Sequence, residues 1–93
     1  MVNNKPTLNN LYAYVQKTRK KALLEAELQQ IEAKLSKYDK LLEDCDKLEL
    51  KNLATWISLE YNNLNLKRIK LSLKLNKLEE ELLLFELEAA TRD

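Results

Sequence analysis

The sequence contains no glycine and only one proline, Pro6, among its 93 residues. Tight turns between strands need backbone conformations with positive φ, and glycine is the residue that normally supplies them. A chain without glycine is therefore a poor candidate for a β-sheet protein or a compact α/β fold. The absence favours long helices joined by few connections.

Histidine is also absent, and Cys45 is the only cysteine. No histidine can activate that thiol, and no glycine-rich phosphate loop or nucleophile motif occurs. A single cysteine cannot form an internal disulfide, so we expect a reduced thiol rather than an intermolecular bridge. Glu79, Glu80 and Glu81 are consecutive, so on a helix they point about 100° apart and do not converge on a metal ion. The sequence predicts a protein that is not an enzyme, with no catalytic residue, no cofactor and no metal site.

Long apolar runs are missing as well. The longest, residues 82–85, is far short of the ~20 residues that span a bilayer. The N-terminus lacks the charged-then-apolar layout of a secretory signal. The net charge of +1 provides no overall field that would steer the chain to nucleic acid or membrane. We expect an intracellular protein, cytoplasmic or nuclear, that is neither secreted nor membrane-spanning, and membrane association is the weakest of the functions considered.

The second half of the sequence carries an apolar residue in alternating steps of four and three, with one charged interruption at Arg68. These positions are Ile57, Tyr61, Leu64, Arg68, Leu71, Leu75, Leu78, Leu82, Phe85 and Ala89. This heptad pattern is typical of a helix that lies along another helix, as in a coiled coil. The first half carries a matching seam, formed by Leu24, Leu28, Ile31, Leu35, Tyr38, Leu42 and Cys45.

Upstream of the first seam, Leu8, Leu11, Val15 and Ala22 mark a face whose phase differs by about one residue. Local winding or a bend can absorb such a slip, so we expect the first ten helical residues to pack differently from the remainder.

Two amphipathic arms with a polar link between them predict an all-α fold, a long antiparallel helical hairpin. Thr7 is a suitable N-cap for the first arm, and Asp44, Asp46 and Asn52 mark the reversal. Asp46 and Glu49 also have the spacing of a capping box. We expect a flexible N-terminus at 1–6, one domain at 7–90 and a tail at 91–93. Within the domain, arm one covers about 7–43, the link about 44–47 and arm two about 48–90. The alternative is a three-helix version in which the second arm bends at Asn62 and Asn63.

The second arm has a further apolar face, opposite its seam. Its members are Leu59, Leu66, Ile69, Leu73, Leu83, Leu84 and Leu87. If each buried side chain contributes ~1.5–3 kcal/mol, covering the set is worth on the order of 10 kcal/mol. One neighbouring helix covers only one face, so we expect this face to bind a protein. The chain is then a non-enzymatic scaffold or complex subunit in a multi-helix bundle, and the partner is either a second copy or another helical protein.

Basic residues cluster in both arms and would form a band across the hairpin. They are Lys17, Arg19, Lys20, Lys21, Lys67, Arg68, Lys70, Lys74 and Lys77. The band could solubilise the leucine-rich rod, meet an acidic partner helix, or hold an anion such as a phosphate backbone. The last option makes a small nucleic-acid-binding regulator the alternative function. The near-neutral net charge and the lack of interleaved aromatics make it secondary.

Two single residues allow two interpretations each. Arg68 lies in the seam, where it either extends its charge to the solvent edge or pairs with Glu25 or Glu27 to fix the register. Trp56 and Tyr38 are expected to meet near the turn as core aromatics, and a binding hot spot at Trp56 is the alternative.

Overall fold

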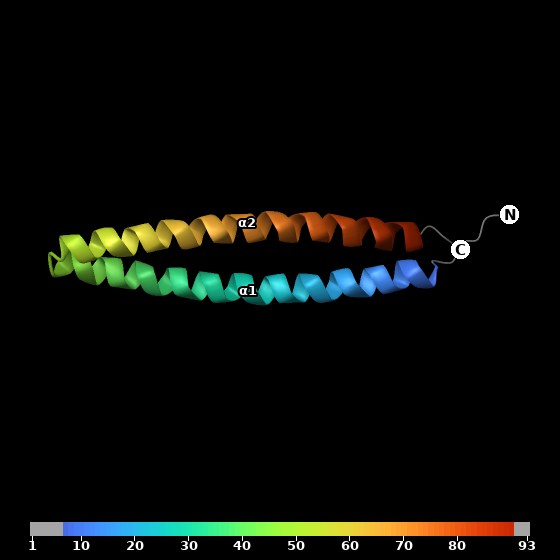
Figure 1. The fold of residues 1–93 in the computed structure, drawn as a ribbon, viewed down its shortest axis with the longest axis horizontal. Helices are drawn as coiled ribbons and strands as arrows, with labels where there is room; N and C mark the ends of the chain where they lie inside the picture. Colours follow the sequence, from blue (N-terminus) through green and yellow to red (C-terminus); the bar gives the residue numbers. More distant parts are fainter. Residues whose placement is uncertain (1–6, 91–93) are drawn as a thin grey trace.

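The chain folds into two long antiparallel helices, α1 (Leu8–Lys47) and α2 (Lys51–Ala90), which lie side by side along their whole length (Figure 1). This computed structural model describes residues 7–90. Each helix has 40 residues and is therefore about 60 Å long. The predicted all-α helical hairpin is confirmed. The predicted flexible N-terminus, 1–6, and the predicted C-terminal tail, 91–93, lie outside the described residues.

The predicted seams form the contact between the helices. Among the described residues, the buried side chains are Ile31, Leu35, Cys45, Ile57, Leu71, Leu78 and Leu82. All belong to the two heptad patterns, which confirms their assignment to the packed faces. α2 runs without interruption through Asn62 and Asn63, so the three-helix alternative is wrong. Burial of the apolar positions on both sides of the two asparagines outweighs their low helix propensity.

Thr7 caps the start of α1, as predicted. Its backbone is extended, with φ −71° and ψ 162°, and its Oγ1 accepts a hydrogen bond from the N–H of Asn10 at 3.1 Å. This bond satisfies one of the four N–H groups that a helix leaves without a partner in its first turn.

The reversal lies later than predicted. Residues 44–47 belong to α1, and the chain turns over residues 48–50. Glu49 adopts a left-handed conformation with φ 57°, and its N–H donates to the carbonyl of Asp46 at 3.2 Å. The N–H of Leu50 donates to the carbonyl of Cys45 at 2.9 Å. These two bonds form a Schellman motif, which satisfies the last carbonyls of α1. Asp46 and Glu49 therefore end one helix instead of forming a capping box for the next.

The N-terminal part of α1 keeps the phase of the seam that begins at Leu24. The half-buried positions upstream of Leu24 are Lys21, Lys17 and Tyr14, at the same steps of three and four. Leu8, with 81% of its surface exposed, lies outside the packed face together with Leu11 and Val15. The assignment of these three residues to a packed face is wrong, because the long contact downstream fixes the rotation of the whole helix.

Candidate interaction surfaces

The seven residues predicted to bind a protein are all exposed on α2. Their exposed fractions range from 42% at Ile69 to 64% at Leu73. We call this set the outward strip; it consists of Leu59, Leu66, Ile69, Leu73, Leu83, Leu84 and Leu87. α1 covers the opposite side of α2, where Ile57, Leu71 and Leu78 are buried. The described part of the hairpin therefore leaves this second apolar face without cover.

The outward strip has a heptad pattern of its own. In steps of three and four it passes through Leu59, Asn62, Leu66, Ile69, Leu73, Asn76, Glu80, Leu83 and Leu87. Six of these nine positions are apolar, and Glu80 occupies the place where the leucine repeat would continue. A helix with this spacing can pack along a further helix.

A second apolar region, which sequence reasoning missed, lies at the open end of the hairpin. The exposed Leu8, Leu11 and Val15 of α1 lie at the same end as Leu83 and Leu87 of α2 (Figure 1). Stepping back from Leu24 by three and four residues leads to Lys21, Lys17 and Tyr14, which would have revealed that the leucines face outward. Exposed apolar side chains of both helices therefore lie at the open end of the hairpin.

Tyr14 takes the packed position at this open end. Its ring stacks on Phe85 with ring centroids 4.7 Å apart, and its hydroxyl donates to a carboxylate oxygen of Glu86 at 2.7 Å. The hydrogen bond to the Glu86 carboxylate, more than any other cause, raises the pKa of Tyr14 above its ordinary value. These two contacts hold the N-terminal part of α1 against the C-terminal part of α2.

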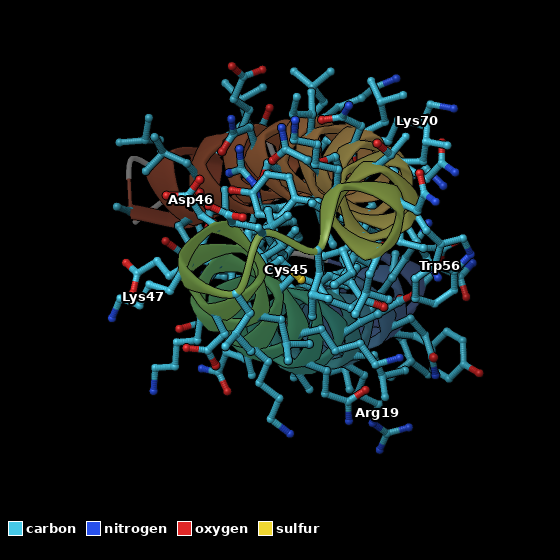
Figure 2. All side chains as sticks on the ribbon, turned by 90° about the vertical axis from the view of Figure 1, so that its left-hand side faces the viewer. Arg19, Cys45, Asp46, Lys47, Trp56 and Lys70 are labelled. Atoms are coloured by element: carbon cyan, nitrogen blue, oxygen red, sulfur yellow. The ribbon has the colours of Figure 1, made fainter. Side chains whose placement is uncertain are left out.

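Trp56 lies on the outside of the rod, with 56% of its surface exposed. Figure 2 shows its side chain at the edge of the molecule, whereas Cys45 lies between the two helices. The prediction that Trp56 is a core aromatic is wrong, because its position on α2 is rotated away from the packed face that contains Ile57. A binding hot spot at Trp56 stays a prediction. The buried Cys45 forms no disulfide.

Three residues of the predicted basic band form ion pairs with glutamates. Lys17 lies 3.4 Å from Glu81, Lys21 lies 3.8 Å from Glu25, and Lys67 lies 3.8 Å from Glu27. All three pairs are partly exposed, so each contributes little to stability.

Arg68 makes a different contact from the one predicted. Its Nε donates to Asn65 Oδ1 on its own helix at 2.9 Å. Glu27, a proposed partner, faces Lys67 instead, and Glu25 faces Lys21. The prediction that Arg68 fixes the register is therefore wrong, and its half-buried side chain agrees with the alternative of a charge at the solvent edge.

The remaining basic residues do not form one surface. Lys20, Lys74 and Lys77 line a shallow recess between the helices together with Glu81. Figure 2 shows Arg19 on the outer side of α1 and Lys70 on the outer side of α2. The structure thus brings together three of the nine predicted anion-binding residues and places Arg19 and Lys70 apart from them.

Within residues 7–90, no three side chains of the histidine, cysteine, aspartate or glutamate type are placed to hold one metal ion. Neither α1 nor α2, over the residues described, has a stretch long and apolar enough to cross a membrane.

Comparison with known proteins adds no relative: no protein-family model matches the chain, and no curated protein or solved structure is significantly similar to it.

Proposed function

We propose that this chain is a non-enzymatic assembly protein, an intracellular scaffold or complex subunit that acts through helix–helix contacts. The observation that supports the proposal is the outward strip, an exposed apolar heptad pattern on the side of α2 that α1 does not cover. Monomeric proteins rarely expose a continuous apolar surface of this kind without an interaction partner.

The two helices differ in a way that indicates which one is central. The outward positions of α1 between 29 and 44 are mostly polar or charged, and this segment exposes only one large apolar side chain, Leu41. α2 has large apolar side chains on two opposite sides. In the proposed assembly α2 is therefore an inner helix of a bundle of three or more helices, and α1 is an outer one.

Covering the outward strip would contribute on the order of 10 kcal/mol before the costs of association are subtracted. This exceeds the contribution of the exposed ion pairs between α1 and α2, which is typically below about 1 kcal/mol each. Burial of apolar surface thus dominates the energetics of the proposed contact.

The experiment compares two variants of the full chain. In the strip variant, Leu59, Leu66 and Leu73 are changed to glutamine. In the matched control, the same change is made at three exposed leucines elsewhere, Leu23, Leu41 and Leu48. We expect the unmodified chain and the control to associate or precipitate as the concentration rises. Of the three proteins, only the strip variant should remain a soluble monomer at the same concentrations. Equal behaviour of all three proteins in sedimentation would count against the proposal.

Binding of nucleic acid is the second candidate, favoured only by the three lysines that line the recess with Glu81. It predicts a salt-sensitive gel shift that is lost when Lys20, Lys74 and Lys77 are changed to glutamine. The absence of a shift at low salt would remove this candidate.

A further inference from the structure

We infer that the outward strip binds a helix of a different protein, one with an acidic flank, and not a second copy of this chain. The inference rests on the proposed function and adds the chemistry of the partner. It follows from the charges on the two sides of the strip.

The two flanks of the strip differ in charge. The lysine flank consists of Trp56, Asn63, Lys70 and Lys77, which follow one another at intervals of seven residues, and the series continues into Leu84 of the outward strip. The glutamate flank consists of the series Ser58, Asn65, Ser72, Glu79 and Glu86. The first series contains no acidic residue and the second contains no basic one. Lys70, Lys77 and Glu79 are exposed, so the partner helix would meet these charges directly.

An antiparallel second copy would bring like charges together. The two-fold axis of such a pair places each flank of the strip beside the same flank of the other copy. Lys70 and Lys77 would then lie against a series with no acid, and Glu79 and Glu86 against a series with no base. This holds in every register. Sliding one copy along the other changes which residues face each other, but the lysine flank still faces the lysine flank and the glutamate flank still faces the glutamate flank.

A parallel second copy is unfavourable for a different reason. Its two-fold axis is parallel to the helices. Every residue of the heptad pattern that runs along the outward strip, from Leu59 to Leu87, therefore meets the same residue of the second copy. Glu80 would face Glu80 of the second copy inside the apolar contact, and Asn62 and Asn76 would also pair with themselves. A carboxylate pair without a counter-charge is costly to bury. Both symmetric arrangements are therefore disfavoured by residues of the strip or its flanks.

A different helix avoids both faults. Acidic side chains facing Lys70 and Lys77, basic side chains facing Glu79 and Glu86, and a basic side chain facing Glu80 would give every charge of the strip and its two flanks a counter-charge. Complementary flanks of this kind select the partner and exclude self-pairing.

The chain itself supplies a surrogate for such a partner. The variant K70E/K77E/E79K keeps the apolar strip but reverses three flanking charges. Glu86 is left unchanged because it accepts the hydrogen bond from Tyr14. In an antiparallel pair of the unmodified chain with this variant, the lysine flank meets an acidic one. The variant paired with itself still brings like charges together.

The test is sedimentation equilibrium of each protein alone and of an equimolar mixture, at about 0.05 M and about 0.5 M salt. We expect the mixture to form a 1:1 dimer at least about tenfold tighter than either protein with itself, and we expect salt to weaken this dimer. Circular dichroism of the variant checks that its helices are retained. A second mixture, with the strip variant L59Q/L66Q/L73Q in place of the unmodified chain, should not form the dimer.

Two results would overturn the inference. A discrete dimer of the unmodified chain alone, as tight as the mixed dimer, would show that a second copy is the occupant, and the proposed assembly function would stand. A mixture no tighter than its components would show that the flanks do not select the partner. Failure of the proposed function itself would appear separately, as equal behaviour of the unmodified chain and the strip variant both alone and in the mixture with K70E/K77E/E79K.

Discussion

Glu49 holds a backbone conformation that glycine adopts more easily. Its φ of 57° lies in the left-handed region, where a side chain crowds the backbone, and it occupies the position of the Schellman motif where glycine is most common. The chain contains no glycine, so it closes its only described reversal with a residue that is strained there. Two backbone hydrogen bonds, from Glu49 to Asp46 and from Leu50 to Cys45, hold the conformation.

Changing Glu49 to glycine should therefore stabilise the hairpin by roughly 0.5–1 kcal/mol, because relief of the strain exceeds the added freedom of the unfolded chain. The matched control is Glu43→Gly, an exposed position inside α1, which should lose about 1 kcal/mol. Urea unfolding followed by circular dichroism measures both changes. Loss of stability in both variants would show that Glu49 is not strained.

Tyr14 gives the hairpin a dependence on alkaline pH. The hydrogen bond to Glu86 raises the pKa of Tyr14 above its ordinary value of 10.0 in the folded chain. The folded state therefore holds this proton more tightly than the unfolded state does. The stabilising contribution is complete below the unfolded pKa and is lost as the pH rises through the folded pKa.

Tyr14→Phe keeps a ring that can stack on Phe85 but removes the hydroxyl. We expect the melting temperature of the unmodified chain to fall more steeply above pH 10 than that of the variant. Parallel pH profiles of the two proteins would contradict the assigned role of the hydrogen bond.

The two faces of α2 should respond very differently to the same substitution. Leu71 is 7% exposed in the contact with α1, whereas Leu73, two residues further on, is 64% exposed on the outward strip. Leu71→Ala should cost about 2–4 kcal/mol, because it leaves a cavity in the contact. Leu73→Ala should change the stability of the isolated hairpin by less than about 0.5 kcal/mol. Chemical unfolding at low protein concentration measures both, and equal losses would mean that the outward face is already covered.

The helical elements follow from the sequence where the heptad pattern is continuous. The seam positions from Leu24 to Cys45 and from Ile57 to Leu82 pack as predicted, because burial of regularly spaced leucines decides the rotation of a helix. The outward strip could be predicted for the same reason, as the apolar residues left over on α2.

The ends of the elements could not be predicted in the same way. Asp44 and Asp46 resemble turn residues, but the reversal depends on backbone hydrogen bonds around Glu49 that composition does not reveal. Leu8, Leu11 and Val15 form a local pattern that competes with the longer one downstream. The longer pattern prevails because it buries more surface, and Tyr14 becomes the packed residue.

The whole molecule is a rod with a thin core. Even Ile57, the most buried of the described residues, keeps 3% of its surface exposed, since each helix has only one neighbour. A core of this size usually needs support from oligomerisation or a partner, and a ligand that binds only the folded state adds to its stability. Binding at the outward strip would convert α2 from a helix with one neighbour into one with two or more.

The mass of the pure chain in solution, measured by sedimentation equilibrium over a series of concentrations, tests this account most directly. With α2 open on one side, we expect weak association without a discrete tight dimer, so that the average mass rises above 11.0 kDa as the concentration increases or the protein precipitates. An ideal monomer of 11.0 kDa at every concentration up to about 1 mM, both for the chain alone and for its equimolar mixture with K70E/K77E/E79K, would show that water tolerates the outward strip, and it would contradict the proposed role in assembly.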